Sequence, residues 1–372
     1  IHIHTYLTLY ITFGLSRRKK YKLINIIVQC SDFRKTSECI NLFIKQASTI
    51  KVHKMSIQLP ADISSYDRTT FKAWINSFDV VLCDCDGVLW LHNDIYEGAS
   101  DVVNKLTDLG KKVYLITNNN MASRQEMREK CQANNFKLEI ENMISSAFAM
   151  GQYMKHIKFN KKVYVIGSNV LANELESVGL TVIGRGPDVA IDSLPDQVKN
   201  DLGQMDDEVG AVVVGFDHHY SFPKLFKAVN YLRNENVKFL ATNTDESIDF
   251  PFFTFPDAGA IVAGIKNITK IDPIVIGKPS KILSDVTLKD EAHREPKRFL
   301  VVGDRLNTDI MYGNNNNYQT ILVGTGVHNM TDVQQIIDKI NNGKDSTEDT
   351  KKLIPDFYIS SMKELKIKLE SI

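Results

Sequence analysis

From residue 56 onward, short apolar runs alternate with longer stretches of helical spacing, and this alternation constrains the fold more than any other feature. Apolar runs that predict strands occur at residues 79–83, 112–116, 163–166, 211–214, 237–241, 274–276, 299–302, 320–323 and 357–359. One helical stretch between them carries Val102, Val103 and Leu106 and ends at Gly110. Such alternation is typical of βαβ units, so it predicts an α/β fold with a mostly parallel sheet.

Length and composition indicate the size and class of the protein. At roughly 100–200 residues per domain, the 372 residues suggest two domains. The apolar share of 43% and the charged share of 24% argue against disorder, collagen and coiled coil. No apolar run reaches the roughly 18 residues that a membrane span needs, so we expect no membrane association.

The formal net charge of zero conceals an uneven distribution of charge. Residues 1–54 hold ten Lys and Arg against two Asp and Glu, whereas the remainder holds 35 basic and 43 acidic residues. An acidic remainder does not suit a polyanion, so we expect no nucleic-acid partner.

Three interpretations of residues 1–54 stay open: a non-native leader, a targeting peptide and an accessory segment. The positive charges follow an apolar run, which is the reverse of a secretory signal, while the lack of acids fits a mitochondrial presequence better. The chain begins at Ile1 and its first methionine is Met55, which favours a non-native leader. We treat residues 1–54 as a basic leader, disordered or non-native, outside the fold argument.

The cysteine content indicates a reducing compartment. The five cysteines are odd in number, and no pair of CxxC elements predicts a zinc site. We therefore expect a cytoplasmic protein, or a mitochondrial one if the basic leader is native.

Polar residues follow four of the predicted strands. In chain order these are Asp84 and Asp86, Thr117 with Asn118 and Asn119, Lys278, and Asp304 with Asp309. Ligands of open parallel sheets bind at the carboxyl ends of the strands, so these side chains are candidates for one site. An isolated aspartate at a strand end is often only a helix cap, and a lone lysine is usually solvated. Four such elements in succession favour a functional site.

The carboxylates of this set would repel one another unless a cation lay among them. Asp84 and Asp86 are two residues apart, so in an extended segment they lie on one face about 7 Å from each other. At an effective dielectric near 20, they repel each other by roughly 2–3 kcal/mol, and Asp304 would add to this. Hard oxygen ligands of this kind favour Mg²⁺.

The remaining polar elements fit phosphoryl transfer. Gly87 allows a sharp turn after Asp86, Thr117 and the backbone after it can bind phosphate oxygens, and Lys278 supplies positive charge. Together they fit a carboxylate nucleophile that attacks a phosphoryl group.

The ordered set of motifs resembles the haloacid dehalogenase-like hydrolase superfamily. The matching segments are DxDGV at 84–88, Thr117-Asn118-Asn119, Gly277-Lys278-Pro279, and Gly303-Asp304 with Asp309. Residues 83–90, 214–217, 303–310 and 354–358 are further similar to the eukaryotic phosphoglycolate (glycerol-3-phosphate) phosphatases, formerly called 4-nitrophenylphosphatases. The resemblance covers about residues 58–370.

The resemblance implies a Rossmann-like core with an inserted α/β cap domain. It places the core at residues 55–158 and 271–372 and the cap at 159–270. Relatives form dimers through the cap, so a homodimer is expected. Residues 216–221 of the cap are expected to face the active site, and residues 341–352 are expected to be an exposed, mobile insertion.

The resemblance also implies the chemistry. Asp84 would be the nucleophile that forms an aspartyl-phosphate, and Asp86 would be the general acid and base. Mg²⁺ would be held by Asp84, the backbone carbonyl of Asp86 and Asp304, with Asp309 supporting the site. The phosphoryl group would bind to Thr117, Asn118, Asn119 and Lys278. The implied activity is Mg²⁺-dependent hydrolysis of small phosphorylated metabolites such as 2-phosphoglycolate, glycerol 3-phosphate or 4-nitrophenyl phosphate.

Departures from the family pattern leave alternatives open. Residues 256–259 replace a glycine-richer turn, and Ile248 stands where the related pyridoxal phosphatases have a histidine. A phosphatase for pyridoxal phosphate is thereby disfavoured but stays an alternative, as does a phosphoprotein phosphatase. A phosphate-binding scaffold without catalysis would lack Asp84 or Asp86, and both are present.

Overall fold

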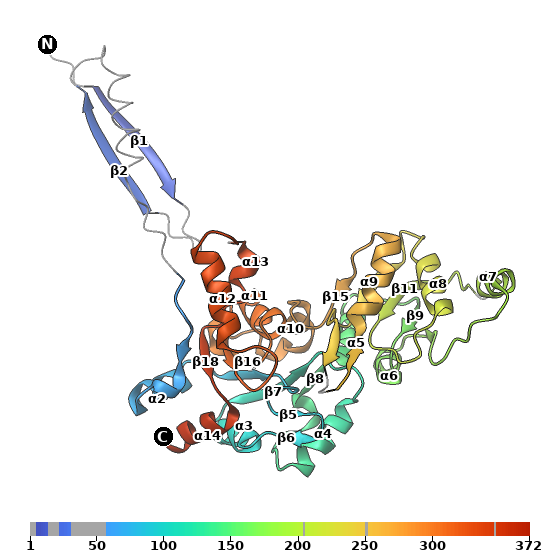
Figure 1. Ribbon diagram of the computed structural model, residues 1–372, viewed down its shortest axis with the longest axis horizontal. Helices are drawn as coiled ribbons and strands as arrows, with labels where there is room; N and C mark the ends of the chain where they lie inside the picture. The colour runs from blue at the N-terminus through green and yellow to red at the C-terminus, as the bar shows by residue number, and fades with distance from the viewer. Residues whose placement is uncertain (1–4, 14–21, 31–56, 204, 250–251, 346) are drawn as a thin grey trace. The chain divides into compact units, whose positions relative to one another are not determined.

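The computed structural model describes residues 5–13, 22–30 and 57–372, apart from 204, 250–251 and 346 (Figure 1). It divides the chain into two units, residues 1–56 and 57–372. In the first unit, β1 (Thr5–Phe13) and β2 (Lys22–Cys30) form an antiparallel pair, and the other residues of the expected leader lie outside the described residues. No helix within the described ranges has the length and apolar character to cross a membrane.

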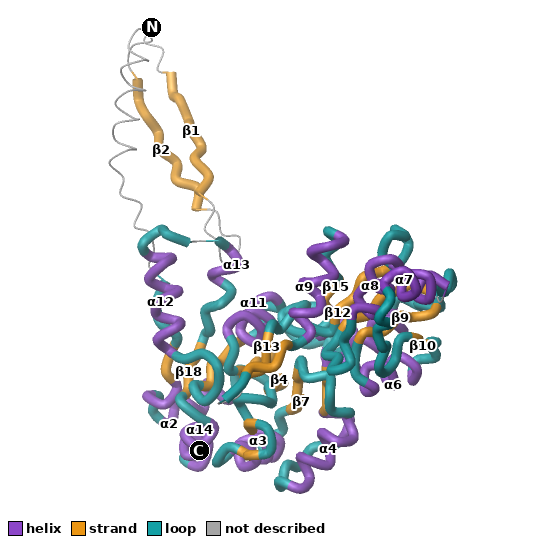
Figure 2. The backbone as a smooth tube through the Cα atoms, turned by 45° about the vertical axis from the view of Figure 1, so that its right-hand side comes forward, coloured by secondary structure: helices purple, strands orange, loops and turns teal. Residues whose placement is uncertain are grey.

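The second unit is built around a seven-stranded sheet whose neighbouring strands all run parallel. In spatial order the strands are β3 (Ala61–Asp62), β18 (Phe357–Ile359), β17 (Gln319–Val323), β16 (Phe299–Gly303), β4 (Val80–Cys83), β7 (Lys112–Thr117) and β8 (Met143–Ser145). Figure 2 shows β4 and β7 side by side. The predicted α/β fold with a parallel sheet is confirmed.

A second parallel sheet has five strands. Their order is β10 (Val182–Ile183), β9 (Lys162–Ile166), β11 (Val209–Val214), β12 (Lys238–Ala241) and β15 (Ile274–Val275). Its last strand, β15, comes from beyond residue 270, where the cap was expected to end. The division into a core and a cap domain stays a prediction.

Two small antiparallel hairpins accompany the sheets, and neither was predicted. One joins β5 (Trp90–Leu91) to β6 (Asp94–Ile95), and the other joins β13 (Ser247–Asp249) to β14 (Thr254–Pro256). Both are too short to show the alternation of side chains that marks a strand in a sequence.

Helices connect most of the strands, as the spacing predicted. Their bounds are α2 Arg68–Ile75, α3 Ala99–Asp108, α4 Arg124–Ala133, α5 Ser146–His156, α6 Asn169–Ser177, α7 Leu194–Gly203, α8 Phe222–Tyr231, α9 Ala258–Thr269, α10 Ile282–Thr287, α11 Met311–Asn315, α12 Met330–Asn341, α13 Glu348–Lys351 and α14 Met362–Glu370. Most described side chains of residues 341–352 are exposed, as expected, although α13 forms within this segment.

Strand β4 is buried on both faces, as a central strand of a parallel sheet must be. Val81 and Cys83 pack into a core cluster with residues of α2, α3 and α14. Val80 and Leu82 point to the opposite face, where their cluster includes α5 and also Val163 of β9. One hydrophobic core is therefore shared by the two sheets.

Candidate active site

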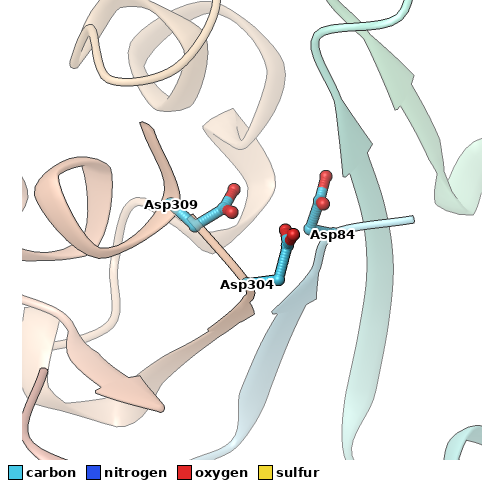
Figure 3. A group of neighbouring side chains, drawn as sticks. All are labelled: Asp84, Asp304 and Asp309. Carbon is cyan, nitrogen blue, oxygen red and sulfur yellow. The ribbon is translucent and has the colours of Figure 1, made fainter. Parts of the chain in front are cut away.

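Three aspartates meet at the carboxyl end of the seven-stranded sheet (Figure 3). Asp84 follows β4 and Asp304 follows the adjacent parallel strand β16, so their strand ends lie side by side. The carboxylates of Asp84, Asp304 and Asp309 offer ligand oxygens that all lie within 4.8 Å of one another. The three residues are 7%, 1% and 1% exposed, which makes their mutual repulsion strong.

A π-helical turn brings Asp309 to the other two aspartates. The turn covers Leu306–Ile310 and follows β16 closely. The Asp309 carboxylate accepts a hydrogen bond from the backbone N–H of Arg305 at 3.0 Å. π-Helical turns are rare and frequently occur at functional sites. Asp309 is therefore itself a member of the carboxylate cluster, and its supporting role stays a prediction.

Lys278 is the cation inside this cluster. Its Nζ donates to Oδ1 of Asp84 at 2.5 Å, to Oδ1 of Asp309 at 2.7 Å and to the carbonyl of Ile116 at 3.2 Å. The residue is only 3% exposed, so the pairing occurs away from bulk water. Lys278 thereby joins the ends of three chain segments at one point.

The backbone of Lys278 is held by Asn118. The Asn118 side chain accepts from the backbone N–H of Lys278 at 2.9 Å and donates to its carbonyl at 3.0 Å. The same amide donates to Asp245 at 3.0 Å. The oxygen and the NH₂ group of the Asn118 side chain are thus both hydrogen-bonded to protein, and Asn118 holds Lys278 in position.

The ionisation of the cluster reflects its burial. Burial raises the pKa of Asp84 well above its ordinary value, Lys278 opposes this, and Asp309 and Asp304 raise it further. Burial together with Asp309 raises the pKa of Asp304 to about 7. Burial lowers the pKa of Lys278, but Asp309 and Asp84 more than offset it, so the pKa is raised overall. Burial therefore favours the protonated form of Asp84 and Asp304, and a bound cation would favour the ionised form of both.

The donor set fits a divalent cation. Oδ1 of Asp304 is fully buried and has no hydrogen-bond partner, whereas Oδ2 accepts from the backbone N–H of Val327 at 2.8 Å. A buried carboxylate oxygen without a partner is costly in free energy, and a metal ligand bond removes that cost. Hard carboxylate oxygens suit Mg²⁺.

Two glycines keep the space beside Asp304 open. Gly87 has a φ of +87°, and a Cβ there would lie 2.5 Å from Oδ2 of Asp304. A Cβ at Gly326 would overlap the same carboxylate, although the Gly326 backbone itself is not in the left-handed region. Any side chain at either position must displace the candidate metal ligand.

Gly326→Ala is therefore expected to weaken Mg²⁺ binding by about 10-fold or more, because the methyl group pushes Asp304 out of place. Calorimetric titration of the metal-free protein with Mg²⁺ measures the effect. Gly264→Ala is the matched control, since the nearest atom to its Cβ would be the Tyr220 hydroxyl at 3.5 Å. Equal affinity in the two variants would contradict the assigned place of Asp304.

The predicted site residues all line one cavity of about 330 Å³. They are Asp84, Asp86, Thr117, Asn118, Asn119, Lys278, Asp304 and Asp309. Of the cap segment 216–221, Phe216 lines the cavity. The rings of His218 and His219 lie against each other, with centroids 3.7 Å apart. The individual roles assigned to these residues stay predictions.

Three further charged residues of the cavity were missed. Asp245, Asp257 and Arg305 line it together with the predicted set. Asp245 follows β12 by four residues, so the strand-end signal that identified Asp84 could have found it as well. Asp257 is the N-cap of α9, and burial raises its pKa to about 6, with Asp245 adding to the effect.

Comparison with known proteins agrees with this geometry. The model of the haloacid dehalogenase-like hydrolase family matches residues 81–181, and a HAD-hydrolase-like model matches residues 275–365. Phosphoglycolate phosphatase 2 of Arabidopsis thaliana is 35% identical over 82% of this chain and 97% of its own length. Glycerol-3-phosphate phosphatase of Mus musculus is 34% identical over 79% of this chain and 92% of its own length.

Solved structures support the fold. A p-nitrophenyl phosphatase from Archaeoglobus fulgidus superposes with a TM-score of 0.64 at 24% identity, over 80% of this chain and all of that chain. The fold, the ordered strand-end residues and the curated relatives agree with one another. The chain belongs to the haloacid dehalogenase-like hydrolase family.

Proposed function

We propose that the protein is a Mg²⁺-dependent phosphatase that hydrolyses small phosphomonoesters by transferring the phosphoryl group to Asp84. The observation that carries the proposal is the buried carboxylate of Asp84, which lies in the cavity wall close to Lys278 and two further aspartates. Substrates of the kind named by its relatives, 2-phosphoglycolate and glycerol 3-phosphate, are the candidates.

The first chemical step is an attack by Asp84. A carboxylate oxygen of Asp84 forms a bond to phosphorus while the bond from phosphorus to the ester oxygen breaks. Asp86, a half-buried residue on the cavity wall, donates a proton to the departing alkoxide. The products of this step are the free alcohol and an aspartyl-phosphate on Asp84.

The second step releases phosphate. Asp86, now ionised, accepts a proton from a water molecule as the water oxygen bonds to phosphorus. The bond between phosphorus and the Asp84 oxygen breaks, which restores the Asp84 carboxylate and frees inorganic phosphate. Asp86 ends the cycle protonated, ready for the next ester.

The cation and the phosphoryl group have separate ligands. The carboxylates of Asp84 and Asp304 and the backbone carbonyl of Asp86 would hold Mg²⁺, with Asp309 beside them. When bound, Mg²⁺ supplies positive charge to the phosphoryl oxygens. Lys278 contributes the fixed positive charge of the protein at the same place.

Thr117 is placed to contact a phosphoryl oxygen. It ends β7, lines the cavity, and its hydroxyl oxygen accepts from the backbone N–H of Asn119 at 3.0 Å. No described residue accepts the hydroxyl proton, which is therefore available to a phosphate oxygen. Asn118 acts differently, because its amide is engaged in holding Lys278.

Removal of Mg²⁺ with EDTA is expected to abolish hydrolysis of 4-nitrophenyl phosphate and to make stability depend on pH. The pKa of Asp304 is about 7 in the metal-free fold, against about 3.9 in an unfolded chain, so the fold binds more protons between those values. The metal-free protein should therefore lose stability as pH rises from about 4 to 7. Thermal melts with EDTA and with Mg²⁺ across this range measure the effect.

The sign of the pH effect is the critical outcome. Added Mg²⁺ should raise the melting temperature most at pH 7 and above. In that range Asp304 of the metal-free protein is ionised with no metal ion to stabilise its charge. A stabilisation that is largest at pH 4 would contradict the metal site.

A substrate panel tests the function itself. We expect Mg²⁺-dependent release of phosphate from 4-nitrophenyl phosphate, 2-phosphoglycolate and glycerol 3-phosphate. Pyridoxal phosphate and a phosphotyrosine peptide serve as the alternative substrates, and faster turnover of either would reassign the substrate class. Absence of hydrolysis of every ester with Mg²⁺ present would identify a phosphate-binding scaffold instead.

A further inference from the structure

Arg305 presents an uncommitted positive charge to the cavity. It follows Asp304 directly, is half-buried and lines the cavity wall. Its guanidinium makes no hydrogen bond to any described residue, and no described carboxylate oxygen lies within the 4.0 Å of an ion pair. Lys278, by contrast, is committed to Asp84 and Asp309.

Asp245, which follows the second sheet, is the carboxylate with the largest effect on the pKa of Arg305. Burial lowers the pKa of Arg305, and the carboxylates that raise it act in the order Asp245, Asp304, Asp309 and Asp84. Arg305 in turn lowers the pKa of Asp257. Asp245 lies in the segment after β12, Asp257 caps α9, and both belong to the cavity wall. A substrate whose phosphoryl group contacts Asp84 would share this cavity with Arg305.

The two carboxylates of that wall already have donors. Asp245 accepts from the Asn118 amide at 3.0 Å and from the Asn243 amide at 3.2 Å. Asp257 accepts from the backbone N–H of Ala258 at 2.7 Å and from Asn243 at 3.3 Å. They attract Arg305 over a distance without using any of its N–H groups.

An unpaired guanidinium in a confined cavity favours an anionic ligand. Its planar fork of five N–H donors matches the two oxygens of a carboxylate. These donors have no partner among the described residues, so they are available to a bound carboxylate. A neutral hydroxyl satisfies fewer of them and adds no charge.

We propose that Arg305 is a specificity-determining residue that binds a carboxylate on the leaving group of the substrate. The preferred class is then phosphorylated hydroxy acids, rather than phosphate esters of neutral alcohols. The inference rests on the proposed phosphatase function and assigns a substrate class to the same site.

A matched pair of esters tests the proposal. 2-Phosphoglycolate and 2-hydroxyethyl phosphate have the same length and differ in a carboxylate against a hydroxymethyl group. Arg305→Gln should lower the ratio of kcat/KM for the first ester to that for the second by about 10- to 100-fold, mainly through KM. Arg305→Lys keeps the charge without the fork and should lose part of this ratio.

A binding measurement separates recognition from chemistry. In the background of Asp84→Asn, calorimetry should show the same selective loss of 2-phosphoglycolate affinity when Arg305 is replaced. Arg128→Gln is the control for loss of a positive charge, since Arg128 pairs with Glu139 and does not line the cavity. Circular dichroism melts establish that each variant is folded, and Arg305→Lys carries the test if Arg305→Gln does not fold.

The outcomes are distinct. An equal loss for both esters, or a parallel weakening of inhibition by inorganic phosphate, would mean that Arg305 serves the phosphoryl group and would overturn the inference. Preference of the unaltered protein for 2-hydroxyethyl phosphate would overturn it too. If the unaltered protein hydrolyses no ester with Mg²⁺ present, the proposed function fails before Arg305 is tested.

Discussion

Asp84→Asn is expected to lower kcat for every phosphomonoester by at least about 10⁴-fold, because the amide cannot form the bond to phosphorus. The side chain keeps its size, so the packing at the end of β4 is retained. Rapid acid quenching of the unaltered enzyme with a ³²P-labelled ester should trap label on Asp84, and the variant should trap none. Peptide mapping by mass spectrometry locates the label.

The control for this prediction is another Asp→Asn change on the same chain. Asp272 has a side chain that is 76% exposed and, among the described residues, forms an ion pair only with Lys266 at the surface, so Asp272→Asn should leave kcat unchanged. Substantial turnover by a folded Asp84→Asn protein would exclude Asp84 as the nucleophile.

Lys278→Met is expected to destabilise the metal-free protein by about 3–5 kcal/mol at neutral pH. The substitution leaves Asp84 and Asp309 buried without the ammonium group that contacts both of them at 2.5 and 2.7 Å. Methionine fills most of the same volume, so the loss reports charge rather than a cavity. Chemical denaturation in EDTA at pH 7.5 measures the free energy of unfolding.

Lys266→Met provides the comparison for a lysine pair at the surface. Lys266 and Asp272 have side chains that are 54% and 76% exposed, and removal of such a pair should change stability by less than about 1 kcal/mol. Lys278→Met should also lower kcat/KM, because the phosphoryl group loses its fixed positive charge. Stability equal to that of Lys266→Met would show that the buried carboxylates are neutral without Lys278.

The central parallel strands could be predicted because their short apolar runs alternate with stretches of helical spacing. Runs such as 80–83 and 299–303 are buried on both faces, and alternation with helices leaves a parallel sheet as the simple solution. The same reasoning predicts from the sequence that Asp84 and Asp304 belong to one site, since adjacent parallel strands end at one edge of the sheet.

The rest of the site depends on contacts that no local pattern encodes. Asp309 reaches the cluster only because the chain forms a π-helical turn, and its spacing from Asp304 does not reveal that turn. Arg305 and Asp257 are far apart in the sequence, yet both line the cavity, Arg305 after β16 and Asp257 at the start of α9. The β13–β14 hairpin was missed because strands of three residues carry too little pattern.

The pairing of β15 with β12 sets a rule for building chimeric enzymes from this chain. The strand that completes the second sheet leads directly into the loop of Lys278, and the backbone N–H of Gly277 donates to the carbonyl of Thr242 at 2.8 Å. An exchange of residues 159–270 for the equivalent part of a relative would replace β12 but leave its neighbouring strand β15 in place. A graft should therefore run through Ile276, so that the donor supplies both strands and the recipient keeps its own Lys278.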